Sequence, residues 1–292
     1  MRTFAASVYL LITALVGVGQ SVPARVNSKP LLLGVVDTIH SERLGENRSL
    51  NIYLPEGYDT ASPARYPVIY LLDGGTDEDF IHIVGLVQFN SFPWLNRMPP
   101  TIVVGITNVD RRRDLTYQTS IEADRKRYPT AGHSNKFIDF IEKELQPYID
   151  KTYKTNASRT LIGESLGGLF AAEVLLKRPA LFDKYIIVSP SLWWDDGSLL
   201  RLPTAPFAAA VNKKTDVYIG IGKEGLGLGE KPHVGAVDAN LLADKLKTSK
   251  AKDLTVFFDY LPQEAHATVS HQAVFNAFHL LFPSPNKSTT IN

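Results

Sequence analysis

The chain has 292 residues, of which 44% are hydrophobic and 21% are charged; this composition suits a globular protein with a full core and excludes a disordered or fibrous one. The formal net charge is only +1, so no global field favours nucleic acid or an acidic membrane surface as a partner. Cysteine is absent, which excludes disulfides, thiolate metal ligands, a cysteine nucleophile and a lipid-anchored cysteine.

The N-terminus is typical of an export signal. Arg2 is followed by an almost wholly apolar run over residues 8–18, and small residues and a proline come next. The run is too short for a comfortable membrane span. We therefore expect residues 1–24 to be a signal peptide that is cleaved between Gly19 and Ala24. An uncleaved anchor or a buried helix is the alternative. Cleavage would leave a periplasmic or secreted protein without stable membrane insertion.

Short apolar runs, rich in β-branched and aromatic residues, alternate with longer helical segments over the rest of the chain. Such runs are typical of strands that are buried on both faces of a parallel sheet. The expected buried strands cover residues 68–72, 102–106, 160–162, 185–188, 217–221 and 254–260. Two earlier runs, 31–39 and 50–54, alternate more in polarity and are expected to form an antiparallel edge pair.

Helices are expected between these strands. Residues 134–148 place their apolar side chains on one stripe, and Pro147 should bend or stop that helix near its end. Further helices are expected over residues 166–177, 237–247 and 270–281. Because strands and helices alternate, we predict an α/β fold with a mostly parallel sheet and helices on both faces. The expected organisation is one domain over residues 25–283 and a flexible tail over 284–292.

The strongest motif for function is G-x-S-x-G, formed by Gly163, Ser165 and Gly167. A strand is expected before it and a helix after it, which is the context of the nucleophile elbow in the α/β-hydrolase fold. The turn is so tight that only small residues fit two positions before and after the serine. It would hold the Ser165 hydroxyl clear of the sheet as a nucleophile. A glycine-rich turn needed only for close packing is the alternative.

The histidine of such a site follows the last strand of the sheet, because the order along the chain is nucleophile, acid, histidine. His266 lies in the loop after the expected strand 254–260 and is the candidate base. Its role would be to take the proton from Ser165 and return it to the leaving alcohol. His271 and His279 are competitors, but both fall within the expected final helix.

The acid should follow the strand 217–221. Glu224 comes directly after that strand and is the preferred candidate. A serine–histidine pair without a tight acid is also considered. The other carboxylates left open are Glu230, Asp238, Asp195 and Asp196.

Two backbone N–H groups are expected to form the oxyanion hole. One is that of Leu166, which follows the nucleophile at the helix N-terminus. The other should come from the loop after the strand 68–72, where Gly75 is preferred and Gly74 and Thr76 are alternatives.

Several segments resemble the putative esterase family of α/β-hydrolases, which includes esterase D-type enzymes and ferric enterobactin esterases. They are RYPVIYLLDGG, VVGITNVDRRRDLT, FIDFIEKELQPYIDKTYKTNASRTLIGESLGGLFA and FDKYIIVSPSLWWDD, which span roughly residues 50 to 194, and the Ser165 and His266 contexts match as well. The periplasmic siderophore-hydrolase branch is the most similar. The chain departs from the family at Glu164, where a histidine is usual and where a glutamate would tune the site electrostatically. It departs again at Tyr117 and Gln118, where Pro-Thr is expected.

Candidate substrate contacts lie in two segments. In the loop 108–133, Arg111 or Arg113 could bind an anionic substrate such as a ferric tris-catecholate, but pairing with Asp110 and Asp114 to pin the loop is the favoured interpretation. Trp193 follows a strand at the edge of the sheet where ligands bind, and could line an acyl or aryl pocket. Core or lid packing is the alternative for this and the other aromatic residues. Those residues are Trp194, Phe89, Phe92 and Trp94.

These patterns predict a serine hydrolase that cleaves carboxylic esters through an acyl-enzyme on Ser165. A siderophore trilactone is the leading substrate. A general carboxylesterase of the feruloyl- or acetyl-esterase type, an acyltransferase and an inactive binding protein are alternatives. No cofactor or metal is expected, because the glycines after residue 220 lack the context of a dinucleotide site and the histidines lack metal-ligand spacing. The expected partner is a small-molecule ester, not nucleic acid.

Overall fold

The computed structural model describes residues 27–227 and 232–282. The chain divides into two compact units, residues 1–32 and 33–292. Of the first unit only residues 27–32 are described, and they form neither helix nor strand. The expected signal peptide, the expected tail and the alternative acid Glu230 all lie outside the described residues.

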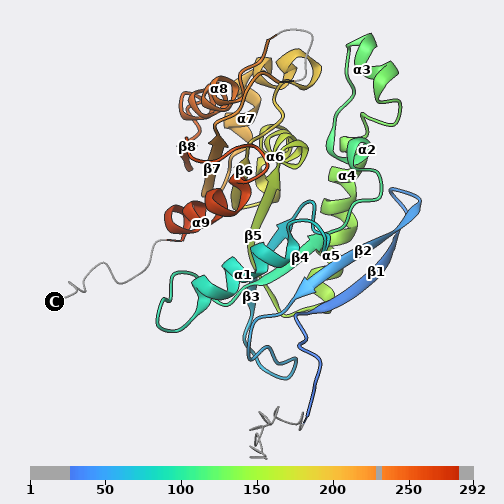
Figure 1. The fold of residues 1–292 in the computed structure, drawn as a ribbon, viewed down its shortest axis with the longest axis vertical. Coiled ribbons are helices and arrows are strands. Elements are labelled where there is room, and N and C mark those ends of the chain that lie inside the picture. Colours follow the sequence, from blue (N-terminus) through green and yellow to red (C-terminus); the bar gives the residue numbers. More distant parts are fainter. Residues whose placement is uncertain (1–26, 228–231, 283–292) are drawn as a thin grey trace, which may run out of the picture. The chain divides into compact units, whose positions relative to one another are not determined.

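The second unit is built on a mixed, mostly parallel sheet whose eight strands have the order β1-β2-β4-β3-β5-β6-β7-β8 (Figure 1). β1 pairs with β2, and β2 with β4, in antiparallel register, while the remaining neighbours are parallel. The expected antiparallel edge pair and the expected parallel strands are therefore confirmed. The strands are β1 (Val35–Ser41), β2 (Glu46–Tyr53), β3 (Tyr66–Leu71), β4 (Ile102–Ile106), β5 (Thr155–Glu164), β6 (Lys184–Val188), β7 (Thr215–Gly222) and β8 (Leu254–Leu261).

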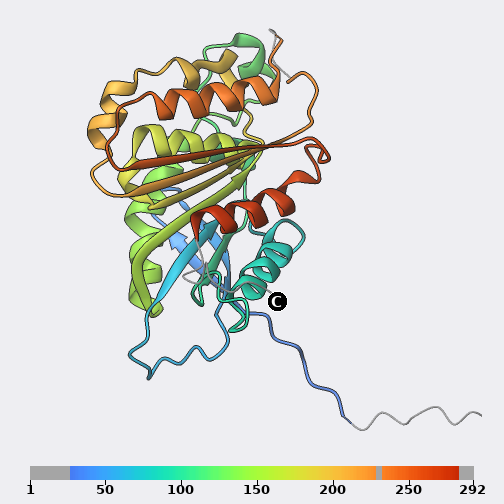
Figure 2. The same cartoon turned by 90° about the vertical axis from the view of Figure 1, so that its left-hand side faces the viewer.

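Helices cover both faces of this sheet (Figure 2). α1 (Phe80–Ser91) and α9 (Val269–Leu281) share one buried apolar cluster, and the other cluster includes α4 (Ser134–Phe140), α5 (Gln146–Thr152), α6 (Leu166–Lys177) and α8 (Gly235–Lys247). The shorter elements are α2 (Arg111–Leu115), α3 (Glu122–Arg127), η2 (Pro179–Leu181), η3 (Trp194–Arg201) and α7 (Thr204–Ala210). None of the helices within the described ranges is long and apolar enough to cross a membrane.

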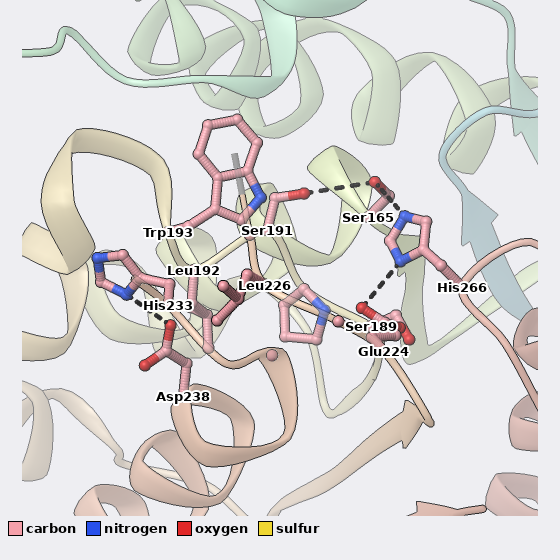
Figure 3. A pocket seen from close by; sticks show the side chains of 14 residues that line it. Ser165, Ser189, Ser191, Leu192, Trp193, Glu224, Leu226, His233, Asp238 and His266 are labelled. Carbon is pink, nitrogen blue, oxygen red and sulfur yellow. Dashed lines mark hydrogen bonds and ion pairs between the residues drawn. The ribbon is translucent and has the colours of Figure 1, made fainter. Parts of the chain in front are cut away.

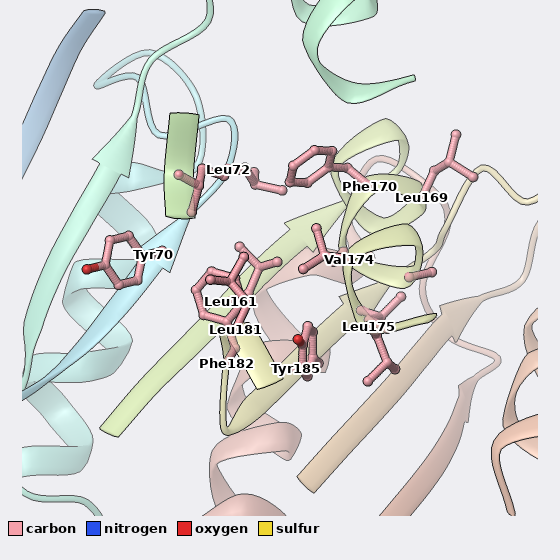
Figure 4. Packing of buried hydrophobic residues seen from close by; sticks show 14 of the residues in the cluster. Tyr70, Leu72, Leu161, Leu169, Phe170, Val174, Leu175, Leu181, Phe182 and Tyr185 are labelled. Atoms are coloured by element: carbon pink, nitrogen blue, oxygen red, sulfur yellow. The ribbon is translucent and has the colours of Figure 1, made fainter. Parts of the chain in front are cut away.

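The helix that follows Ser165 is the most deeply buried helix in the described part of the chain. In α6 every residue from Leu166 to Leu176 is buried, and only Lys177 at its end reaches solvent. Figure 4 shows Phe170 and Val174 of this helix pointing towards Leu161 of β5. A helix that is apolar on all sides is stable only inside a core. The N-terminus of α6 is therefore fixed rigidly against the carboxyl end of β5.

The helix expected over residues 134–148 is longer than predicted. Pro147 does not stop it, because a π-helical turn, η1 (Ile141–Leu145), joins α4 to α5 and the helix continues to Thr152. The N–H of Gln146 bonds to the oxygen of Ile141, five residues back. This wider turn accommodates a proline ring that would collide with the preceding turn of a regular α-helix. Of the two expected outcomes at Pro147, a bend or a stop, the stop is not found, because the helix continues to Thr152.

Candidate active site

The turn between β5 and α6 holds Ser165 in a backbone conformation that non-glycine residues rarely adopt. Its φ is 58° and its ψ is −114°. A Cβ on Gly163 would lie 2.4 Å from the carbonyl oxygen of Gly167, so the two arms of the turn approach each other more closely than any side chain allows. Strain of this kind costs about 1–3 kcal/mol and persists only where the surrounding packing enforces it. The buried α6 supplies that packing.

The Ser165 hydroxyl meets an imidazole from the far end of the chain. His266 lies in the loop between β8 and α9, and its Nε2 is 3.0 Å from Ser165 Oγ. Its Nδ1 is 3.1 Å from Oε2 of Glu224, which follows β7 by two residues (Figure 3). The hydrogen bond to Glu224 is the largest cause that holds the pKa of His266 above its ordinary value. The three side chains thus form a line of contacts in the order that the sequence predicts for nucleophile, base and acid.

The loops that carry Glu224 and His266 are tied together by their backbones. The N–H of Lys223 donates to the oxygen of Glu264 at 2.6 Å. A Cβ on Gly222 would lie 2.8 Å from that same oxygen, so a glycine is needed for the approach. The bond between Lys223 and Glu264 joins the two loops beside Glu224 and His266. The distance between the side chains of Glu224 and His266 therefore depends on both loops together.

The other candidate residues have other partners. Asp238 accepts from His233 Nδ1 at 2.8 Å, and Asp195 accepts from the N–H and the hydroxyl of Ser120. Asp196 lies 3.5 Å from His233 Nε2. Among the competing histidines, His271 contacts His82, and His279 contacts a backbone oxygen within its own helix. Glu224 is thus the carboxylate, among the described candidates for the acid, that the structure brings to His266 Nδ1.

Two backbone N–H groups were expected to stabilise an oxyanion. Leu166 is the first residue of α6, so its N–H has no partner within the helix. The N–H of Gly75 donates to Glu78 Oε2 at 3.0 Å, a side-chain partner that can rotate away. By contrast, the N–H of Gly74 bonds to the oxygen of Ile106 and is committed to the sheet. Of these two glycines, Gly75 is the one whose N–H can turn to a ligand without breaking a backbone pair.

The two arginines considered for substrate binding lie in different surroundings. Arg111 forms a bidentate pair with Asp73, at 2.6 and 2.8 Å, and reaches the carbonyl oxygen of Glu164 beside the nucleophile at 3.4 Å. Arg113 is paired with Asp114 at 2.8 Å and with Glu46 at 2.5 Å. The structure therefore brings Arg111 to the nucleophile, whereas Arg113 pins its loop to the edge of the sheet.

A cavity of about 260 Å³ adjoins the nucleophile. Trp193 lies along its wall (Figure 3), whereas Trp194 is fully buried and donates to the oxygen of Tyr117. The aromatic residues Phe89, Phe92 and Trp94 pack against one another and do not line this cavity. The lining residues are Ser165, Ser189, Pro190, Ser191, Leu192, Trp193, Glu224, Gly225, Leu226, Gly227, His233, Gly235, Asp238 and His266.

Sequence reasoning missed Ser191. Its Oγ lies 3.3 Å from Ser165 Oγ, and its N–H donates to the carbonyl oxygen of Ser165 at 2.9 Å. It therefore holds the backbone of the nucleophile from the side of β6. The available signal was its position, three residues after β6, because the carboxyl ends of parallel strands share one edge of the sheet.

No group of three or more metal-ligating side chains is found among the residues that the structure describes. The site consists of a hydroxyl, an imidazole and carboxylates, and its geometry allows nucleophilic attack with a general base. Such an arrangement performs acyl transfer.

Comparison with known proteins identifies the family. The family model described as "Putative esterase" matches residues 41–255. Ferri-bacillibactin esterase BesA of Bacillus subtilis is 33% identical over 196 residues, which are 61% of this chain and 62% of the relative, so the match spans less than two thirds of that protein. An IroE-like serine hydrolase from Shewanella oneidensis has 35% identity and a TM-score of 0.74 over 85% of this chain and 80% of the other. The BES protein of Bacillus cereus has 26% identity and the same TM-score, over 88% and 98%. The fold is that of the α/β-hydrolases, and the chain belongs to the family of esterases that this model describes.

Proposed function

We propose that this protein is a serine esterase in which Ser165 is the nucleophile, His266 the general base and Glu224 the acid that orients the imidazole. The observation that carries the proposal is the pair of contacts on one ring: Nε2 at 3.0 Å from Ser165 Oγ and Nδ1 at 3.1 Å from Glu224. A carboxylate on Nδ1 favours the tautomer whose Nε2 lone pair faces the hydroxyl.

The reaction proceeds in two halves. Ser165 Oγ attacks the ester carbonyl carbon while His266 takes its proton, and the carbonyl electrons move to an oxygen that faces the N–H groups of Leu166 and Gly75. The intermediate collapses as His266 returns the proton to the leaving alcohol, which leaves an acyl group on Ser165. Water then attacks with the same base and releases the acid. Binding of the oxyanion requires the Glu78 side chain to leave the Gly75 N–H.

The leading substrate class is a siderophore trilactone. It is supported by the similarity to the Bacillus subtilis relative, which is an esterase of ferri-bacillibactin. The cavity beside Ser165 is smaller than the pockets that enclose a whole drug-sized ligand, which are about 300–1,000 Å³, so it would take one arm of a trilactone along Trp193. Arg111, which reaches the carbonyl oxygen of Glu164 beside Ser165, is our candidate to meet an anionic arm, and binding would require its guanidinium to exchange its pair with Asp73 for the substrate.

The small cavity also favours a second candidate, a general carboxylesterase of the feruloyl- or acetyl-esterase type that accepts a single acyl group. We further propose that the protein is exported to the periplasm or secreted, on the strength of the apolar N-terminal segment.

A hydrolysis panel separates these candidates. Ferric trilactone siderophores, short p-nitrophenyl esters and feruloyl sugars are compared for the wild type and Ser165→Ala, with an added alcohol to reveal acyl transfer. We expect the trilactone to be cleaved with the highest kcat/KM and Ser165→Ala to be inactive. Cleavage of simple esters without any action on the siderophores would remove the leading substrate and favour the general carboxylesterase.

A further inference from the structure

The carboxylate of Glu164 lies close to the same nitrogen of His266 that contacts the Ser165 hydroxyl. Glu164 is the last residue of β5, and its Oε1 lies 3.4 Å from His266 Nε2. Ser165 Oγ lies 3.0 Å from that nitrogen, and Glu224 occupies the opposite side of the ring. The base therefore lies between two carboxylates, one of which is positioned to compete with the serine for Nε2.

The surroundings of Glu164 disfavour its charge. The side chain is only 18% exposed, and burial raises its pKa to about 7. Asp79, which precedes α1, and Asp73, which follows β3, raise the pKa further, whereas His266 and Arg111 lower it. Because Arg111 is paired with Asp73, its positive charge offsets only part of the rise in the pKa of Glu164. Glu164 consequently titrates near neutral pH, close to the range in which a histidine titrates.

We propose that Glu164 is a positioning residue that shares a proton with His266 and so sets the pH at which the imidazole becomes free to act on Ser165. This inference rests on the proposed function, because it requires His266 to be the base.

The site that holds the shared proton determines whether His266 can act as a base. When the pair holds one proton on His266 Nε2, the imidazolium faces the Glu164 carboxylate and has no lone pair for the serine. When that proton lies on Glu164, or has been lost, the lone pair can accept the proton of Ser165 Oγ as the bond from Oγ to the substrate carbon forms. The Glu164 carboxylate stabilises the protonated ring, so it delays the onset of activity to higher pH and favours proton transfer once activity begins.

Three charged side chains act on the His266 ring, and they come from different segments of the chain. Glu224 and Glu164 stabilise the imidazolium, and Arg111 opposes it. Because Glu224 and Arg111 remain when Glu164 alone is neutralised, the effect of Glu164 can be measured separately.

The test is the pH profile of kcat/KM for Glu164→Gln, which keeps the shape of the side chain and removes its charge. We expect the rise in activity to move to lower pH by about one unit, the effect of losing one opposite charge at this distance. The plateau at high pH should fall by up to about tenfold, since one unit of pKa corresponds to a tenfold change in the stability of the protonated ring. Glu42→Gln is the matched control, because Glu42 lies on the turn between β1 and β2 with its side chain 88% exposed, and it should leave the profile unchanged.

A uniform loss of activity with an unmoved profile would show that Glu164 serves only packing, and would overturn the inference. If Glu164→Gln fails to fold, Glu164→Asp withdraws the carboxylate from Nε2, and a smaller shift in the same direction is expected; no shift would again overturn it. Direct NMR titration of His266 in each variant gives a readout that does not depend on turnover. Undiminished activity of Ser165→Ala would instead defeat the proposed function itself.

Discussion

Ser165 and Glu224, the proposed nucleophile and acid, are held in place by different kinds of structure. Ser165 lies in a turn whose backbone is bonded on both sides, to Val188 through its N–H and to Leu169 and Ser191 through its oxygen. Glu224 lies in a loop that is more open, where a Cβ on Gly225 would meet nothing within 4 Å and Leu226 is 68% exposed. Ser165 is thus held by a tight turn whose backbone is bonded both to α6 and to the end of β6, whereas the position of Glu224 depends on a contact between two loops that are distant in the chain.

The largest expected effect concerns the nucleophile itself. Ser165→Ala removes the atom that forms the acyl-enzyme, and we expect kcat to fall by about 10⁶-fold. Steady-state hydrolysis of the best ester from the panel measures this loss. A residual rate within tenfold of the wild type would mean that another residue attacks the substrate.

A smaller loss is expected at the more open end of the site. Glu224→Gln keeps the side chain near Nδ1 but no longer favours the productive tautomer, and kcat should fall by about 10³- to 10⁴-fold. Asp238→Asn is the comparison, because Asp238 lines the same cavity but bonds to His233. If Asp238→Asn lost more activity than Glu224→Gln, the acid would have to be reassigned.

Two glycine substitutions compare the two regions without touching a catalytic side chain. In Gly163→Ala the new Cβ would lie 2.4 Å from the Gly167 oxygen, and we expect the free energy of unfolding to fall by about 3 kcal/mol. In Gly225→Ala the new Cβ enters open space, and the change should stay within about 0.5 kcal/mol. Chemical denaturation of both variants measures the difference, and equal effects would contradict the contrast between the tight turn and the open loop.

The smallest expected effect is a displacement of the pH profile. The pKa of His266 is raised, chiefly by its hydrogen bond to Glu224, and only the neutral ring accepts a proton. Activity should therefore rise with pH through an apparent pKa above the ordinary histidine value of 6.5. The kcat/KM profile of the wild type tests this, and a midpoint below 6.5 would show that the carboxylates do not act on the ring as the structure places them.

The sequence predicted the parts of the site that depend on local spacing. Gly163, Ser165 and Gly167 lie within five residues, and the strand and helix around them follow from apolar patterns. The order of residues along the chain was enough to place His266 after the last strand, and its side chain does lie 3.0 Å from Ser165. Such inferences succeed because a tight turn and a parallel sheet leave few alternatives.

Contacts between distant loops could not be predicted in the same way. The sequence left five carboxylates open as the acid, because nothing in it shows that Lys223 bonds to Glu264. It also did not predict the approach of Glu164 to His266 or of Ser191 to Ser165, since each depends on side-chain direction at the end of a strand. The π-helical turn that lets the helix continue past Pro147 was not predicted either, because it leaves no local signature.

The most direct test of the account is covalent labelling with a fluorophosphonate, followed by peptide mass spectrometry. We predict that one label is attached to Ser165 and that labelling is much slower in a His266→Gln variant. No label should appear at the neighbouring hydroxyl of Ser191, whose Oγ is 3.3 Å from Ser165 Oγ. Modification of Ser191 in place of Ser165, or labelling that proceeds equally fast without His266, would contradict it.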